Sequence, residues 1–191
     1  MRRKFEWIAG LRNVLLAGLM CCMLVSCGDS DDSVSPTPLP TVTSLSDLFG
    51  QVLLDANGDT VQTATIEDKS VVAIYFEGYW CTACAAFTPL LLSVYEELTL
   101  DGKSFEVVLV SFAVDRAELL GHMDAMDMLW LAVPPEGGIV DALAQRYAVQ
   151  FIPTLVVVDG DGNTITLSGR DDLAVKGAQA YDDWLASVGG N

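Results

Sequence analysis

The run Val71–Phe76 consists only of aliphatic and aromatic residues, which leaves it no polar face to turn toward water. A strand of this kind is expected in the centre of a sheet that is covered on both faces. Apolar residues at helical spacing follow over residues 83–98, and Phe105–Phe112 then has the pattern of a second buried strand. A strand, a helix and a further strand in this order form a βαβ unit with parallel strands. The chain is therefore expected to build a sheet with helices packed on it.

The segments on either side of this unit complete an α/β domain. Residues 51–55 and 60–63 predict a β-hairpin around the Asn57-Gly58 turn. Further helices are expected over 117–128, 139–147 and 178–186, and further strands over 154–158 and 164–167. We therefore expect one domain, residues 44–188, with a central mixed β-sheet, helices on both faces and an N-terminal β-hairpin.

The first residues have the layout of a secretory signal. A basic segment, residues 2–4, precedes an apolar run over residues 14–25, which is shorter than the about 20 residues that a membrane-spanning helix needs. Leu24–Cys27 resembles a bacterial lipobox, in which the cysteine is lipidated and becomes the first residue of the mature chain. Residues 1–26 are thus predicted to be a lipoprotein signal peptide and Cys27 a lipid anchor. The alternative is an ordinary secreted protein that is cut nearby.

Residues 27–43 are rich in Ser, Asp and Pro and are expected to form a disordered linker. Residues 1–26 carry four basic residues and one acidic residue, a net charge of +3, so the rest of the chain carries −19 against −16 for the whole. Such an acidic protein is not expected to bind nucleic acid, or anionic lipid through a basic patch. The membrane contact should rest on the lipid at Cys27, which predicts a location in the bacterial cell envelope, at the periplasmic or outer-membrane face.

The five cysteines have different expected fates. Cys21 and Cys22 would leave with the signal, and Cys27 would carry lipid. The mature chain then keeps only Cys81 and Cys84, a pair with two residues between them. In an exported protein, where disulfides form and persist, this pair is free to form one.

Cys81 closely follows the first buried strand and opens the helix that Cys84 continues. The amide groups and the dipole at a helix N-terminus stabilise anionic sulfur, so Cys81 is expected to be the attacking thiolate. Cys84 lies on the same helical face and can resolve the mixed disulfide that Cys81 forms with a partner. The pair is therefore suited to thiol-disulfide exchange with protein thiols and disulfides.

Other uses of this cysteine pair are less well supported. Half of a zinc site is one, but His122, which is expected on a helix surface, is the only histidine, and structural zinc takes four ligands. A c-type haem attachment would need His after the second cysteine, where Ala85 stands. An inert structural disulfide would close a loop too short to constrain the chain much. A redox pair is favoured, and neither a metal nor a cofactor is expected.

Several separated blocks of sequence match one family pattern. The first blocks are Tyr75–Cys84 and Phe87-Thr88-Pro89. The others follow in order and at similar spacing, and they are Trp130–Pro134, Phe151–Leu155, Asp159–Gly162 and Ser168–Arg170. Together they resemble the thioredoxin superfamily, and specifically its tryparedoxin and nucleoredoxin branch, over about residues 46–185. The resemblance implies a thioredoxin-like fold, with Cys81 as the nucleophile and Cys84 as the resolving thiol.

The resemblance also assigns roles to residues around the pair. Pro153 would be the cis-proline that faces the disulfide, where the residue alone allows a plain turn proline. Trp80 would shield the sulfurs and offer an apolar surface to partners, or else lie at the edge of the core. Tyr75 stands where many thioredoxins carry a buried Asp that assists proton transfer. Glu77 could relay protons or be a solvated loop carboxylate, and Arg170 could contact partners or form a surface salt bridge.

The chain departs from the family pattern at the centre itself. Members often have two prolines between the cysteines and a basic residue after them, where this chain has Thr82, Ala83 and Ala85. Redox potential and partner choice therefore stay open. The leading hypothesis is a monomeric, lipid-anchored reductase of protein disulfides outside the cytoplasm, supplied by a transmembrane thiol-electron donor. The alternatives are a disulfide oxidase or isomerase, and a non-catalytic lipoprotein that binds partner peptides beside Pro153.

Overall fold

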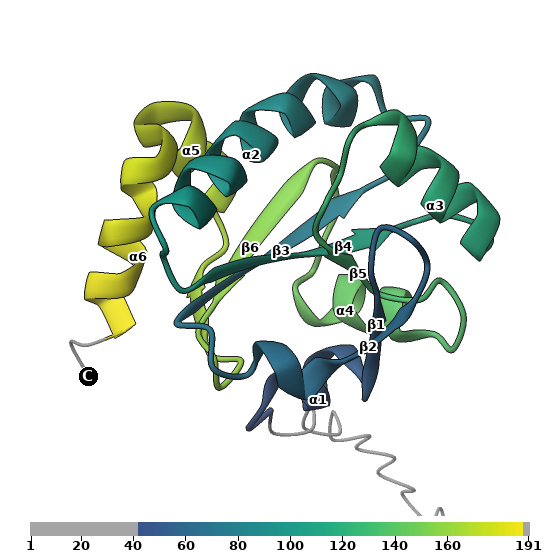
Figure 1. The fold of residues 1–191 in the computed structure, drawn as a ribbon, viewed down its shortest axis with the longest axis horizontal. Helices are drawn as coiled ribbons and strands as arrows, with labels where there is room; N and C mark the ends of the chain where they lie inside the picture. Colours follow the sequence, from purple (N-terminus) through teal and green to yellow (C-terminus); the bar gives the residue numbers. More distant parts are fainter. Residues whose placement is uncertain (1–41, 189–191) are drawn as a thin grey trace, which may run out of the picture. The chain divides into compact units, whose positions relative to one another are not determined.

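The structure is a computed structural model that describes residues 42–188. Its strands are β1 (Val52–Leu54), β2 (Thr60–Gln62), β3 (Val71–Glu77), β4 (Phe105–Ser111), β5 (Leu131–Ala132), β6 (Thr154–Val158) and β7 (Thr164–Thr166). The helices are α1 (Leu45–Phe49), α2 (Thr82–Leu100), α3 (Arg116–Ala125), α4 (Ile139–Arg146), α5 (Gly169–Lys176) and α6 (Ala180–Val188). Short 3-10 turns are η1 (Thr63–Ile66) and η2 (Gly177–Gln179). The strands form one sheet in the order β2-β1-β5-β4-β3-β6-β7 (Figure 1).

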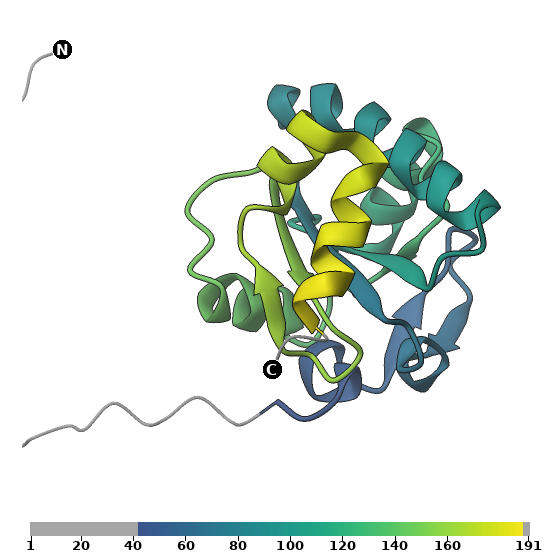
Figure 2. The ribbon, with the colours of Figure 1, turned by 90° about the vertical axis from the view of Figure 1, so that its left-hand side faces the viewer.

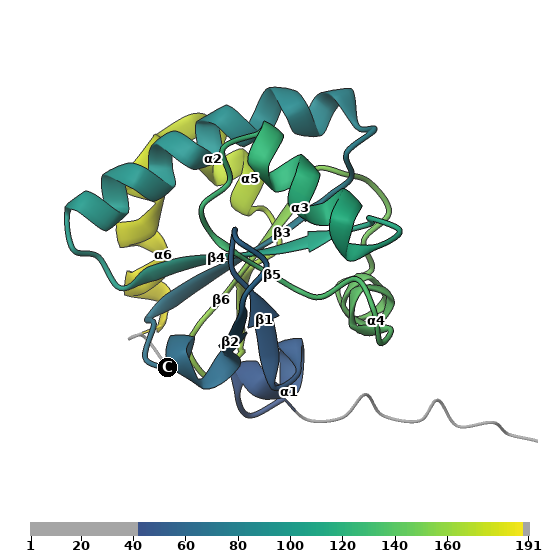
Figure 3. The same ribbon diagram turned by 45° about the vertical axis from the view of Figure 1, so that its right-hand side comes forward.

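Helices cover both faces of this sheet, which confirms the expected α/β architecture. Helices α2 and α3 lie on one side and α1 and α4 on the other (Figure 3). Helices α5 and α6 pack on the same side as α2 (Figure 2). Side chains of β3 alternate between the two core clusters, with Ala73 and Tyr75 facing α2 and Ile74 and Phe76 facing α1 and α4.

Strand β3 lies in the middle of the sheet and is buried along its whole length. It runs parallel to β4, with Glu77 opposite Ser111, and antiparallel to β6, with Tyr75 opposite Leu155. The parallel β3–β4 pair joined through α2 is the predicted βαβ unit. Since the chain leaves β3 at Glu77, the end of this strand positions the loop that leads to Cys81.

Helix α2 packs against the sheet through Phe87, Leu91, Val94 and Leu98, which are all buried. Pro89 lies inside the helix, where it removes one backbone donor. The length and apolar composition of α2 would also suit a membrane span. Its buried contacts with the sheet make it a core helix of the domain instead.

Three elements have no counterpart among the sequence-based expectations. Helix α1 and strand β5 are too short for an apolar period to be visible. Helix α5 is mostly polar and begins with two acidic residues in its first turn, so it carries little amphipathic pattern. Each of them depends on packing against the sheet more than on a local signal.

The predicted signal peptide, residues 1–26, and the predicted anchor Cys27 lie outside the described residues, as does the linker up to residue 41. Val42 and Thr43, the last two residues of the predicted linker, lie within the described part of the chain. The Thr43 amide donates to Asp47 Oδ2 at 3.0 Å, and Val42 packs against the core cluster to which Leu45 and Phe49 of α1 belong.

Candidate active site

A disulfide joins Cys81 and Cys84 at the start of α2, with their Cα atoms 5.2 Å apart. Cys81 is the N-cap residue of the helix, and its Sγ accepts the Cys84 amide N–H at 3.1 Å. Cys81 is half-buried, whereas Cys84 is only 1% exposed. After reduction, the same amide and the helix N-terminus stabilise negative charge on Cys81. The pair thus combines an accessible sulfur with a buried one.

The loop before β6, which includes Phe151, Ile152 and Pro153, lies beside this disulfide. The Ile152–Pro153 peptide bond is cis, as the family resemblance implies. The Ile152 carbonyl oxygen lies 3.8 Å from Cys81 Sγ, and Pro153 itself is buried. Phe151, one residue earlier, is 77% exposed. Segments from two distant parts of the chain therefore meet at the sulfurs.

Trp80 lies at the surface, 56% exposed, so the alternative that placed it at the edge of the core is wrong. Its ring contacts the ring of Tyr79 edge-to-face, with centroids 4.9 Å apart. It also lies over Gly78, where a Cβ atom would come within 2.9 Å of the indole. Tyr79, Trp80 and Phe151 together present exposed aromatic surface around the disulfide, while the role of Trp80 toward partners stays a prediction.

Tyr75 is fully buried on the face of β3 that α2 covers. Its hydroxyl lies 2.9 Å from Thr88 Oγ1 and 3.4 Å from the carbonyl oxygen of Cys84, to which Thr88 also donates at 3.0 Å. Burial raises the pKa of Tyr75 above its ordinary value. The side chain is therefore a neutral group that helps hold the turn carrying Cys84.

Glu77 is fully buried at the end of β3, so the alternative of a solvated loop carboxylate is wrong. Its Oε2 lies 2.8 Å from Nε2 of His122 on α3, and its Oε1 has no partner. His122 is also corrected: it is only 14% exposed, because its ring turns inward to this carboxylate. The alternation of β3 puts Glu77 on the same face as Tyr75. No sequence signal identifies His122 as its partner, since the two are 45 positions apart.

Arg170 lies in the first turn of α5 and is exposed. None of the ion pairs within residues 42–188 includes it, so the salt-bridge alternative finds no support there. Burial dominates the pKa of Tyr75, and the positive charge of Arg170 opposes that effect. Helix α5, which carries Arg170, packs through Leu173 on the same side of the sheet as Tyr75. The contact of Arg170 with partners stays a prediction.

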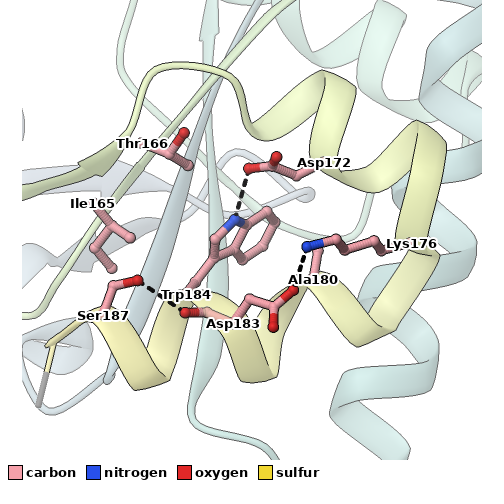
Figure 4. A pocket seen from close by; sticks show the side chains of 8 residues that line it. All are labelled: Ile165, Thr166, Asp172, Lys176, Ala180, Asp183, Trp184 and Ser187. Carbon is pink, nitrogen blue, oxygen red and sulfur yellow. Dashed lines mark hydrogen bonds and ion pairs between the residues drawn. The ribbon is translucent and has the colours of Figure 1, made fainter.

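A separate hollow of about 190 Å³ lies between β7, α5 and α6 (Figure 4). Its charged side chains are already paired within the protein. The Trp184 indole donates to Asp172 at 3.0 Å, and Lys176 donates to Asp183 at 2.6 Å. With these groups engaged, the hollow is part of the helix packing and not a second candidate site.

Comparisons by sequence and by structure find the same family of proteins. Residues 68–164 match the family model described as thioredoxin-like. Nucleoredoxin of Bos taurus is 36% identical over 122 residues, which are 63% of this chain and 27% of that protein, so this chain spans about a quarter of the length of that relative. The thioredoxin structure from Wuchereria bancrofti is 34% identical with a TM-score of 0.61, covering 73% of this chain and 97% of that one. Tryparedoxin from Trypanosoma brucei is 28% identical with a TM-score of 0.65, covering 73% and 96%.

Proposed function

Since this chain belongs to the thioredoxin superfamily, within its tryparedoxin- and nucleoredoxin-like branch, we propose that it is a thiol-disulfide oxidoreductase. The observation that carries the proposal is the Cys81–Cys84 disulfide at the N-terminus of α2, beside the cis bond before Pro153. One sulfur can be reached by a partner, and the other is close enough to form a disulfide with little backbone movement. These are the requirements for two-step thiol-disulfide exchange.

In the reductive direction, the Cys81 thiolate attacks one sulfur of a partner disulfide. The Cys81–partner bond forms, and the other partner sulfur leaves as a thiolate. Cys84 then loses its proton and attacks Cys81 Sγ, so that the Cys81–Cys84 disulfide forms and the second partner sulfur leaves. Two electrons pass from the cysteine pair to the partner, and a reductant must restore them before the next cycle. The reverse sequence oxidises a partner dithiol.

We propose reduction of protein disulfides as the working direction. No basic residue follows Cys84, where Ala85 stands, so the Cys81 thiolate is not stabilised by a positive charge at that position. A less stabilised thiolate makes the reduced pair the stronger electron donor, because a strongly oxidising pair is one whose reduced form is stabilised. Equilibration with a redox buffer tests this, since a potential near about −270 mV indicates a reductant and one near about −120 mV an oxidant. The oxidase or isomerase alternative follows from the second result.

We propose that the protein acts as a monomer outside the cytoplasm, held at a membrane by lipid on Cys27. The support is in the sequence, where the lipobox-like Leu24–Cys27 ends the signal of residues 1–26. In that compartment the pair needs electrons from a transmembrane thiol-electron donor. Labelling of cells with a radioactive fatty acid tests the anchor: the full chain should take up label, and Cys27→Ala should not. A wild-type chain that is exported without label would show that no anchor exists.

The redox function is tested most directly by trapping its intermediates. Cys84→Ser cannot resolve a mixed disulfide, so partner proteins should remain bound to Cys81 and be released by a thiol reagent. Cys81→Ser, the matched control, should trap none and should lose insulin-reduction activity. If Cys81→Ser reduces insulin as well as wild type, the redox function is wrong, and the alternative of a non-catalytic peptide-binding lipoprotein gains support.

A further inference from the structure

Large apolar side chains are exposed around Cys81, on the three loops that follow β3, follow β4 and precede β6. Residues 78–81, 112–115 and 149–152 of these loops are called the Cys81 face. The exposed side chains are between 49% and 82% accessible, and they are Tyr79, Trp80, Val114 and Phe151. A group of exposed apolar side chains, especially one bordered by polar residues, is typical of a surface that binds a partner.

The three loops meet at one edge of the sheet. Strand β4 runs parallel to β3 and β6 antiparallel to it, so the ends of β3 and β4 lie beside the start of β6. The Phe112 amide donates to the Glu77 carbonyl at 3.0 Å, which joins the first two loops. The Ile152 carbonyl lies 3.8 Å from Cys81 Sγ, which places the third loop beside the first. The exposed apolar residues therefore surround the attacking sulfur.

A shallow hollow continues the Cys81 face away from the disulfide. Its volume is about 190 Å³, and it is lined by Phe112, Val149, Gln150, Phe151 and Ile152. Four of these side chains are apolar and none is charged. The hollow can therefore take an apolar side chain that lies next to the reactive cysteine of a partner.

The charge that borders the Cys81 face is negative. Asp115 is the one charged residue of the face, which has no basic residue. The Glu118 carboxylate adjoins it, because its Oε2 accepts the Val114 amide at 2.7 Å. The same carboxylate acts on the first loop, since its negative charge is the main cause that raises the pKa of Tyr79. The exposed apolar residues are thus bordered by two carboxylates.

The rest of the chain does little to offset this charge. Residues 27–191 carry a net charge of −19. Arg116, which follows Asp115, is engaged in an ion pair with Glu136 at 3.0 Å. Arg170 is an exposed cation on α5, and its effect on partner choice is separated by the experiment below.

We propose that the Cys81 face binds partner proteins whose reactive cysteine lies in an apolar surface flanked by lysine or arginine side chains. This preference rests on the oxidoreductase function proposed above and names the partner class of the same site. The exposed aromatic rings cover the apolar surface of the partner, and the area removed from water supplies affinity. The two carboxylates attract the basic residues, which accelerates encounter and disfavours partners with acidic residues beside their cysteine.

Peptides with one activated cysteine measure this preference. Each carries a leucine next to a cysteine that is joined in a disulfide to thionitrobenzoate, and the peptides differ only in whether the flanking residues are lysine, glutamine or glutamate. The Cys81 thiolate of the reduced protein attacks the peptide sulfur, the Cys81–peptide bond forms, and the aryl thiolate leaves with the electron pair of the broken bond. Stopped-flow absorbance of the aryl thiolate gives the rate constant, which is divided by that of β-mercaptoethanol with the same peptide.

We expect the lysine peptide to react roughly 10-fold faster than the glutamate peptide at low salt, with the glutamine peptide between them. The difference should shrink in about 1 M salt, where charges are screened over about 3 Å. Replacing the leucine by glycine should slow the reaction of wild type, and Phe151→Ala should weaken that preference for leucine, because Phe151 lines the hollow.

Matched charge variants test whether the preference belongs to the Cys81 face. Asp115→Asn combined with Glu118→Gln removes both carboxylates, and asparagine is also a good N-cap for α3. We expect this pair to lower the ratio of the lysine to the glutamate rate. Glu96→Gln combined with Glu97→Gln removes the same charge from exposed positions of α2. These lie about 22 to 24 Å along the helix from Cys81, so the control pair should keep the wild-type ratio.

The outcomes separate this preference from the function on which it rests. If the peptides react at equal corrected rates, or if the control pair lowers the ratio as much as Asp115→Asn with Glu118→Gln, the preference is wrong while the oxidoreductase function stands. A glutamate peptide that reacts fastest, and that Arg170→Gln slows, would assign partner choice to Arg170 and overturn the proposal. If wild type releases no aryl thiolate from any peptide and reduces no protein disulfide, both proposals fall.

Discussion

Replacing Tyr75 by Phe removes one hydroxyl from the core and leaves the ring in place. Thr88 donates its own hydrogen to the Cys84 carbonyl at 3.0 Å, so Tyr75 is the donor in the 2.9 Å bond to Thr88 Oγ1. In Tyr75→Phe the Thr88 hydroxyl keeps its bond to Cys84, and no buried donor is left without a partner. Losing one neutral hydrogen bond under these conditions costs about 1 kcal/mol of unfolding free energy. For a chain of 191 residues, this lowers the melting temperature by about 2 to 4 °C.

Thr88→Val is the matched comparison, because it removes both hydrogen bonds of Thr88 with little change of shape. The Tyr75 hydroxyl then keeps only the 3.4 Å contact with the Cys84 carbonyl. A buried hydroxyl that is left poorly satisfied adds a penalty of about 1 to 3 kcal/mol to the about 1 kcal/mol of the lost hydrogen bond, so we expect Thr88→Val to lose roughly 2 to 4 kcal/mol. The double variant should lose less than the sum of the two single variants.

Urea unfolding of the oxidised protein measures all three variants, with an unchanged m-value as the check that the unfolded state is the same. The test is which of the two single variants loses more unfolding free energy. If Tyr75→Phe loses as much stability as Thr88→Val, the assignment of donor and acceptor is refuted. Since Tyr75 stays protonated, Tyr75→Phe should also leave the pH dependence of disulfide exchange unchanged. A shift of that profile would mean that the hydroxyl takes part in proton transfer.

Three further predictions concern the surface, the core and the pH dependence of stability. Gly78→Ala places a Cβ atom 2.9 Å from the Trp80 ring, so Trp80 fluorescence should shift and partner reduction should weaken, and an unchanged spectrum would contradict the contact. Leu91→Ala, on the buried face of α2, should lose about 2.7 to 5 kcal/mol in urea unfolding. Leu100→Ala, at an 87% exposed position, should stay within about 0.5 kcal/mol of wild type. Burial raises the pKa of Glu106 above its ordinary 4.5, so its contribution favours folding below pH 4.5 and is lost as pH rises through the raised pKa. Glu106→Gln should remove that part of the slope when unfolding is measured on both sides of pH 4.5, and an unaltered slope would argue against it.

The redox chemistry of Cys81 and Cys84 could be predicted because the strand and the helix start that position this pair are visible in the neighbouring sequence. Val71–Phe76 marks the central strand by its unbroken apolar character, and β3 extends it by one residue, to Glu77. Cys81 caps the helix as its position after that strand suggests. The cis bond before Pro153 is confirmed, but it was implied by the family resemblance and not by residue chemistry.

The surroundings of the centre could not be predicted, because they depend on how distant elements pack. The sequence alone is equally consistent with Glu77 in a solvated loop, since nothing near it indicates that β3 extends to this residue. Its partner His122 lies on α3, and only the packing of that helix beside the end of β3 brings the two together. Likewise, Ser111 becomes a neighbour of Glu77 through the strand register. Pairs of this kind are a property of the tertiary structure.

The hydrogen bond from the Cys84 amide to Cys81 Sγ, at 3.1 Å, has a consequence for spectroscopy. In the oxidised protein the acceptor is a neutral disulfide sulfur, and in the reduced protein it becomes a thiolate, which accepts more strongly. The Cys84 amide proton should therefore move to lower field on reduction and move again as Cys81 is protonated. In a ¹⁵N-labelled sample, this one resonance would follow the charge on the attacking sulfur through a full pH titration, with no probe attached to either cysteine.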